Sequence, residues 1–285
     1  MKEALVARAR GLGTRLLSAE LLAEIDAATD PAPVFARAGL PAVPDEVDVA
    51  AHDRIARDAA ILARWSTELG DAPARRHRTR APLAPLWLDE DRRSLRAIIR
   101  GLAAHTAPRR RLAGTMPTPN LPPPVLAELA EQTDLHGIAR VLEEHDHPYA
   151  AVVAGKQLDP LSLELALGRC FGDLARPRDR AMRAYVRQAI DAENAEAALL
   201  IAARGKGVTD AFVRGGELID RRTFDGACRD LVDEARARLA EALESTPLAA
   251  ALFDAAPGAV ADATLRWQLA TQAKLRRLEP LSLAP

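Results

Sequence analysis

The chain has 285 residues, of which 48% are hydrophobic and 28% are charged. A chain of this length and composition can bury a sizeable core, which excludes an intrinsically disordered protein. Its 39 basic and 40 acidic residues give a net charge of -1, so no global field draws nucleic acid or an acidic substrate toward it. We therefore expect no nucleic-acid partner.

The N-terminal stretch MKEALVARARGLGTRLL is charged throughout, and no segment reaches the roughly 18 to 20 uncharged apolar residues of a membrane span. The two cysteines, Cys170 and Cys228, lie far apart in apolar helical contexts. This placement favours reduced thiols over a disulfide framework or a metal site. We expect a cytoplasmic protein without direct transmembrane insertion.

Helical periodicity runs along the whole chain. Apolar residues recur at spacings of three and four in LLSAELLAEI, HDRIARDAAILARW, DLHGIARVLEE and RDLVDEARARLAEALE, and strand patterns are almost absent. Ser18, Thr133 with Asp134, and Asp179 precede helical runs as N-terminal caps or first-turn acids. Proline-rich stretches such as PAVPDE and PTPNLPPPV separate the runs. The sequence predicts an all-α fold with a core of Leu, Ala, Val and Ile.

Three segments resemble one another: TDPAPVFARAG from Thr29, DHPYAAVVAG from Asp146 and STPLAAALFDA from Ser245. Each places a proline at the start of a short apolar helix, and Pro148 and Pro247 lie 99 residues apart. A longer helical pattern follows each segment: DRIARDAAILARW, PLSLELALGRCFGDLA and ADATLRWQLATQAKLRR. Such spacing predicts an internal repeat.

A second recurring element supports the repeat. Asp91 and Ser94 stand 100 residues before Asp191 and Asn194, and a glycine-bearing connection follows each pair. We therefore predict three related helical units, at residues 1–104, 105–204 and 205–285. By the same spacing, a third Asp-x-x-Asn helix is expected at or just after the last residue, so the third unit should lack its last helix.

The paired polar residues predict helix clamps. Residues three apart project from the same face of a helix, so Asp191 and Asn194 share a packing face with small apolar side chains. An amide offers donors and an acceptor to free backbone groups, and a carboxylate accepts backbone N–H groups or pairs with arginine. We expect Asp91 and Ser94 to do the same less well, because a hydroxyl has one donor where an amide has two.

Several stretches resemble the socket-forming rotor component of the vacuolar-type (V/A-type) ATPases, which is designated C in the archaeal and bacterial enzymes and d in the eukaryotic enzyme. They are RARGLGTRLLSAELL, the helix D-x-x-S-L-R-A-I-I-R-G, HPYAAVV, YVRQAIDAEN and FVRGGELI. The resemblance implies a funnel of three similar helical units in pseudo-threefold arrangement. It implies a non-catalytic rotor subunit, with the central shaft and the membrane rotor ring as partners and no cofactor. Ser94 departs from the asparagine that is usual in that family.

Other chemistry has weaker signals. LDED, from Leu88 to Asp91, suits the start of a helix better than an acid/base pair, and LEEHDH, from Leu142 to His147, points its side chains in too many directions for a metal site. The stretches around Lys156 and Lys206 lack the glycine and hydroxyl residues of a P-loop. We expect no catalytic, cofactor-binding or metal residues.

Two arginine clusters flank the first Asp-x-x-Ser helix, and they either contact the rotor ring or lipid headgroups or lie in solvated loops. Their members are Arg75, Arg76, Arg78 and Arg80, and Arg109, Arg110 and Arg111. The leading alternative for the whole chain is a helical-repeat scaffold that binds peptides on a concave face. A helical enzyme that uses the carboxylates of LDED or LEEHDH would need a divalent metal.

Overall fold

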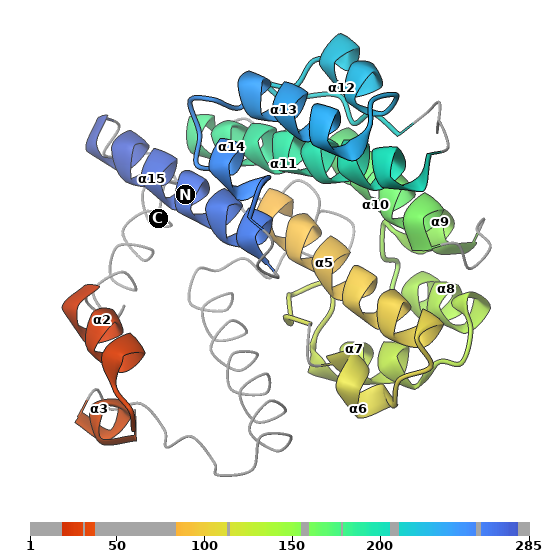
Figure 1. Cartoon of the computed structure of the whole chain (residues 1–285). Helices are drawn as coiled ribbons and strands as arrows, with labels where there is room; N and C mark the ends of the chain where they lie inside the picture. Colours follow the sequence, from red (N-terminus) through yellow and green to blue (C-terminus); the bar gives the residue numbers. More distant parts are fainter. Residues whose placement is uncertain are drawn as a thin grey trace.

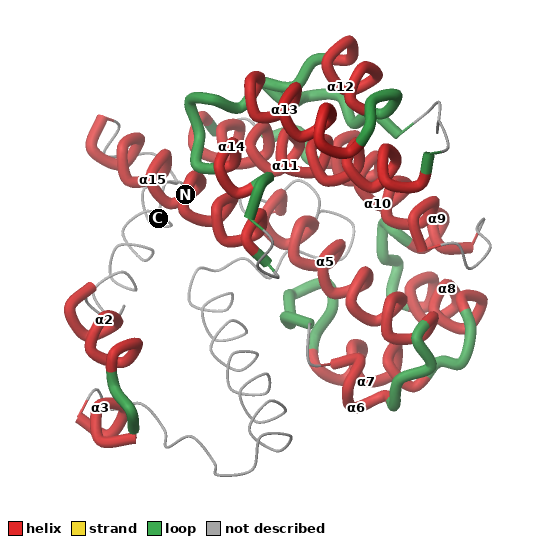
Figure 2. The backbone as a smooth tube through the Cα atoms, viewed as in Figure 1, coloured by secondary structure: helices red, strands yellow, loops and turns green. Residues whose placement is uncertain are grey.

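The computed structural model describes residues 19–30, 32–37, 84–112, 115–154, 160–177, 179–205, 211–254 and 258–278. Every regular element within these ranges is a helix, which confirms the predicted all-α fold (Figure 2). In Figure 1, α2 and α3 lie beside each other and apart from the body formed by α5 to α15. The predicted cap Ser18 lies outside the described residues.

The helices fall into a short N-terminal pair and two longer series. The pair is α2 (Ala19–Ala27) and α3 (Ala32–Arg37). The first series is α5 (Ala84–Ala103), α6 (Pro108–Arg111), α7 (Pro123–Glu131), α8 (Leu135–Glu144), α9 (Ala150–Ala154) and α10 (Pro160–Leu174). The second series is α11 (Arg180–Arg204), α12 (Arg221–Ala227), α13 (Val232–Ala242), α14 (Leu248–Ala251) and α15 (Ala259–Leu278).

Local sequence explains where several helices begin and end. Asp134 Oδ1 accepts the Gly137 N–H at 2.7 Å, and Asp179 Oδ1 accepts the Ala181 N–H at 2.9 Å. Both aspartates are N-caps, as predicted, and they satisfy backbone donors that have no partner within the helix. Helix α11 ends at Arg204, and its C-cap Gly205 has a φ of 62°, a left-handed conformation that glycine adopts without steric cost.

The two longer series repeat one order of elements. Each begins with a long helix, α5 or α11, and a loop and shorter helices lead to a short helix, α9 or α14, that follows Pro148 or Pro247. A long closing helix then packs back on the opening one, as α10 does on α5 and α15 on α11. Short helices are present at all three predicted segments: Pro33 lies inside α3, whereas Pro148 and Pro247 precede α9 and α14. The run HDRIARDAAILARW lies outside the described residues.

Two large apolar clusters form the core. The first joins α5 to α7, α8, α9, α10 and the start of α11, and the second joins the rest of α11 to α12, α13, α14 and α15. Leu, Ala, Val and Ile predominate, while Tyr149, Phe171 and Phe224 are the largest fully buried side chains. The predicted unit boundaries at 104 and 204 lie just after α5 and α11. The core therefore runs across both boundaries, because α5 and α11 pack mainly on helices that follow them.

No described helix is both long and apolar enough to cross a membrane. Cys170 and Cys228 are free thiols and half-buried. Burial raises the pKa of each thiol to about 11.

Candidate functional site

The carboxylate of Asp191 holds the loop that follows α11. Its Oδ2 accepts the Glu217 N–H at 2.9 Å, its Oδ1 accepts the Ile219 N–H at 3.0 Å, and both oxygens lie within 3.2 Å of the Leu218 nitrogen. Gly216 is needed beside it, because a Cβ at this position would clash with Asp191 Oδ1. Asp191 is fully buried, so this one side chain satisfies three successive backbone donors of the loop.

Asn194 holds the same loop one helical turn further along α11. Its Nδ2 donates to the Val213 carbonyl at 2.9 Å, and its Oδ1 accepts the Val213 N–H at 2.9 Å. Asn194 is also fully buried. The two side chains together fix residues 211–220 against the middle of α11. The sequence predicts partners of this kind, namely free backbone groups.

Ser94 makes the matching contact in the first series. Its hydroxyl accepts the Met116 N–H at 2.9 Å and donates to the Met116 carbonyl at 3.1 Å. One hydroxyl thus makes the same pair of bonds to a loop residue that the Asn194 amide makes to Val213. The single donor of a serine is sufficient here, because Ser94 and Asn194 each use only one donor and one acceptor.

Asp91 differs from Asp191 in the donors that it meets. Its oxygens accept hydrogen bonds from the Thr118 hydroxyl and from Asn120 Nδ2, the latter at 2.7 Å. His147 Nε2 lies 3.2 Å from Asp91 Oδ2, and His147 Nδ1 accepts the Tyr149 N–H at 3.3 Å, so Nε2 carries the proton that is donated. The first clamp therefore ties its loop and the turn before α9 to α5 through side chains.

A buried ionic network joins α5, α10 and α11, and no pattern in the sequence predicts it. Arg92 donates to Glu193 Oε2 at 2.5 Å and to Asp89 Oδ1 at 2.6 Å, and Arg96 also pairs with Glu193. Asp89, Arg92 and Glu193 are each at most 6% exposed. A buried charge persists only when it is paired with an opposite charge, and each charge of this network has such a partner. The Nε atoms of Arg92 and Arg96 are buried without a hydrogen-bond partner among the described residues, so the network is not fully satisfied.

Neighbouring side chains complete the network. Tyr185 donates to Asp89 Oδ2 at 2.6 Å, and the Arg92 guanidinium lies 4.9 Å from the centre of the Phe171 ring. On α10, Gly168 leaves the room that the Glu193 carboxylate occupies, since a Cβ there would lie 2.6 Å from Oε1. Two features of the sequence could have indicated the network. Glu193 is a charged residue beside Asn194 on an alanine-rich helix, and α5 carries two arginines four residues apart.

The network changes the pKa of its members. Burial alone raises the pKa of Glu193, but the charges of Arg92 and Arg96 lower it more, so the pKa lies below its usual value. Asp89 likewise has a lowered pKa, because Arg92, Arg93 and the Tyr185 hydroxyl outweigh its burial. Both carboxylates are therefore held in the charged form.

These pKa directions predict how stability depends on pH. A carboxylate whose pKa is lower in the folded than in the unfolded chain stabilises the fold above its unfolded value, about 4.3 for Glu, and loses that contribution as pH falls through the folded value. We expect the difference in unfolding free energy between the native chain and Glu193→Gln to be constant from pH 7 to about pH 5.5. It should then shrink below about pH 4. Urea titrations at several pH values measure it, and a difference that grows on acidification would contradict the lowered pKa.

The interpretation of LDED as a helix start is wrong. Helix α5 begins at Ala84, so Asp89, Glu90 and Asp91 lie beyond its first turn. Asp89 belongs to the ionic network and Asp91 to the first clamp. The proline at position 85 is compatible with the first turn of a helix, which places the start one turn earlier than the acidic run suggests.

The arginine clusters are only partly described. Arg75, Arg76, Arg78 and Arg80 lie outside the described residues. In the second cluster Arg109 and Arg110 are exposed, whereas Arg111 is half-buried and donates to main-chain carbonyls of Thr106, Ala130 and Gln132. Arg111 therefore links α6 to the end of α7.

The LEEHDH side chains diverge. His147 turns inward to Asp91, while His145 lies 3.8 Å from Glu128 on α7, and Glu143 and Asp146 are exposed. Across the part of the chain that the structure describes, no three His, Cys, Asp or Glu side chains form a group that could hold a metal ion.

Comparison with known proteins adds no family assignment. No protein-family model matches the chain. No curated protein matches it either.

Proposed function

We propose that this chain is a non-catalytic rotor subunit of a V/A-type ATPase. In this role it couples the central shaft to the membrane rotor ring during proton or sodium transport, and it lies on the cytoplasmic face of the membrane. One observation carries the proposal. The order of α5, α7, α8, α9 and α10 recurs in α11 to α15, with a loop clamp at the same place on the opening helix, 100 residues apart.

The repeated clamps suit such a role physically. A part that transmits torque has to be stiff, and stiffness comes from close-packed helices whose loops are tied down. Asp191 and Asn194 hold one loop to α11, and Ser94 and Asp91 hold the corresponding loop to α5. The ionic network ties the opening helices of the two series to each other through Arg92 and Glu193.

The resemblance in sequence supplies the remainder of the proposal. Three such units around an axis would leave a central depression, the socket, for the foot of the shaft. The unit that begins at residue 1 would be the first of the three, and the opposite face of the body would rest on the ring. Large interfaces are required on both sides, because a small contact would slip under load.

Co-purification with the shaft subunits of the rotary ATPase from the same organism tests the proposal. We expect one-to-one binding that survives size-exclusion chromatography, and a titration by calorimetry then gives the affinity. Binding to isolated rotor rings is measured separately. If the chain binds neither the shaft nor the ring, the rotor role is rejected and the peptide-binding scaffold is favoured.

The arginine clusters allow a sharper test of the ring contact. One variant changes Arg75, Arg76, Arg78 and Arg80 to glutamine, a second changes Arg109 and Arg110, and a matched control changes the exposed Arg276 and Arg277 of α15. If a cluster faces the ring, its variant should bind rings more weakly and with less salt dependence than the control. Unchanged ring binding would remove that cluster from the interface.

A further inference from the structure

Helix α15 carries two exposed leucines on one face. Leu265 is 52% exposed and Leu269 is 55% exposed, and residues four apart project from the same side of a helix. The exposed Ala273 continues this row by one further turn. Single exposed leucines are common on protein surfaces, whereas a contiguous apolar row is a candidate contact surface. Leu265, Leu269 and Ala273 are called the α15 row below.

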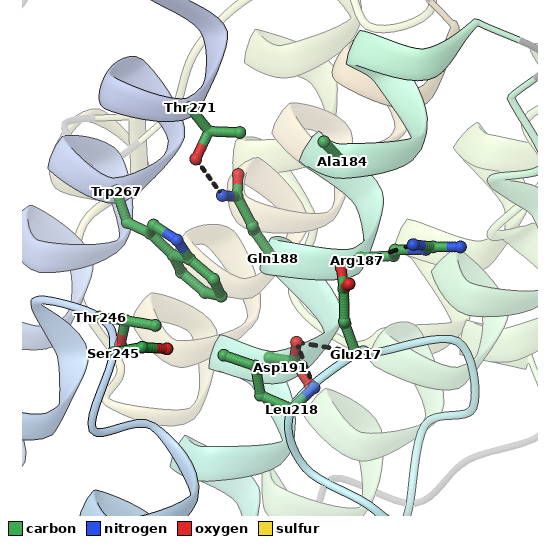
Figure 3. A pocket seen from close by; sticks show the side chains of 10 residues that line it. All are labelled: Ala184, Arg187, Gln188, Asp191, Glu217, Leu218, Ser245, Thr246, Trp267 and Thr271. Carbon is green, nitrogen blue, oxygen red and sulfur yellow. Dashed lines mark hydrogen bonds and ion pairs between the residues drawn. The ribbon is translucent and has the colours of Figure 1, made fainter. Parts of the chain in front are cut away.

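The buried side of α15 includes several polar side chains. Gln268 and Gln272 are buried. Trp267 and Thr271 point toward α11 and line a small pocket there (Figure 3), and the Thr271 hydroxyl accepts a hydrogen bond from Gln188 Nε2 at 2.6 Å. A helix that packs on one side only would place its leucines on that side. The exposed α15 row therefore indicates a second contact on another side of the helix.

Helix α10 is the counterpart of α15 in the first series. Both helices close their series by packing on the opening helix, α5 or α11. Buried positions recur between them at an offset of 100 residues: Leu163 and Gly168 are buried in α10, and so are Ala263 and Gln268 in α15. The two loop clamps show the same offset. Residues of α10 and α15 can therefore be compared position by position.

The counterpart of Leu265 is covered by a helix. Leu165 is only 4% exposed and belongs to the apolar cluster that α11 forms with the helices that follow it. On the same side of α10, Gly168 lies against α11, because an added Cβ would be 2.6 Å from Glu193 Oε1. Helix α11 therefore covers this face of α10. The matching face of α15 has the shape and the apolar character that fit a second helix.

The charges of α15 select the kind of helix. Its basic residues are Arg266, Lys274, Arg276 and Arg277, and its one acidic residue is Asp262, so the net charge of the helix is +3. All five side chains are exposed. Like charges would oppose the pairing of two copies of this chain through α15, whereas acidic side chains on a partner would be attracted.

We propose that the α15 row binds an amphipathic helix of a partner protein, with small or apolar side chains against Leu265 and Leu269 and acidic side chains facing Arg276 and Arg277. Side chains of one helix would then fill the grooves of the other. The alanine-rich α11 packs on α10 in the same way. The inference does not depend on the rotor role, because it rests on α15 and its comparison with α10.

A fluorescence-anisotropy titration of the full chain tests the proposal. The probe is a labelled, alanine-based peptide of about 20 residues, long enough to be helical in water, with leucines along one face and glutamates beside them. A matched peptide has lysine in place of every glutamate. We expect saturable binding of the acidic peptide and about tenfold weaker binding of the basic one. Equal binding of the two peptides, or no saturation at about 0.5 mM of the chain, would overturn the proposal.

A leucine variant places the binding on the α15 row. The double change Leu265→Gln and Leu269→Gln should weaken binding of the acidic peptide about tenfold. Its midpoint of thermal unfolding should match that of the native chain, because both leucines are exposed. Leu231→Gln, at an exposed leucine outside α15, is the matched control and should bind as the native chain does. Unchanged binding by the double variant would overturn the proposal.

An arginine variant tests the charge selection. The double change Arg276→Gln and Arg277→Gln should weaken binding of the acidic peptide and reduce its dependence on salt. The matched control changes Arg222 and Arg229, which are exposed and lie outside α15. If the variant and the control bind the acidic peptide equally well, the row does not select an acidic helix, and the proposal is overturned.

Two further measurements test other occupants of the α15 row. We expect a monomer by light scattering and no sedimentation with vesicles of phosphatidylcholine and phosphatidylserine. A dimer that is lost in the double variant of Leu265 and Leu269 would assign the row to a second copy of the chain. Sedimentation with vesicles that is lost in the same variant would assign the row to a lipid surface. Either result would overturn the proposal.

Discussion

Replacing Glu193 with alanine should lower the free energy of unfolding by about 3–5 kcal/mol, because the change leaves Arg92 and Arg96 without the buried carboxylate that neutralises them. Arg92 is 3% exposed, so water cannot readily take over the role of Glu193. Among the described carboxylates Arg92 would retain Asp89, which Arg93 and Tyr185 also use. Urea denaturation followed by circular dichroism measures the change.

The matched control for Glu193 is Glu244→Ala, at an exposed glutamate in the turn after α13. Its unfolding free energy should stay within about 0.5 kcal/mol of that of the native chain. If Glu193→Ala were no more destabilising than this control, the network would not be the junction between α5, α10 and α11 that the distances indicate.

Asp191→Ala should cost about 2–4 kcal/mol, because the loop loses the acceptor of three successive N–H groups. The cost depends on how far water reaches the freed groups, and Ile219 is buried whereas Glu217 is exposed. Hydrogen exchange distinguishes this loss from a general destabilisation. Amide exchange at residues 217–219 should accelerate more than exchange in α13.

Asp262→Ala is the control for Asp191, since its carboxylate is 71% exposed and lies 3.4 Å from the similarly exposed Arg266. A surface pair of this kind contributes about 0–1 kcal/mol. Equal losses in the two variants, or unchanged exchange at residues 217–219, would show that the carboxylate does not hold the loop.

Local sequence rules were sufficient for much of the fold. The apolar spacing predicted helices, Asp134 and Asp179 were recognised as caps, and the prolines marked the starts of α9 and α14. Each of these features depends on residues within one or two helical turns. The same rules misplaced the start of α5, because a run of acids resembles a first turn, although Asp89 and Asp91 are buried in contacts with residues far away in the sequence.

The sequence predicted only part of the candidate site. The spacing of Asp191 and Asn194 placed both on one face of a helix, and their polar groups predicted backbone partners. The spacing did not identify these partners as Val213 and residues 217–219. Glu193 lies between them, yet its partners are 97 and 101 residues away on α5. No periodicity carries information about a pairing at that distance.

The amino-acid sequence by itself determined the all-helical class, the helix caps and the recurrence of one pattern 100 residues apart, since these follow from short-range geometry and from comparing the chain with itself. Only the tertiary structure decided that Asp89, Arg92 and Glu193 form a buried network and that Trp267 and Thr271 line a pocket beside α11. The physical reason is that burial and cavities depend on which helices meet, and that depends on packing across the whole chain.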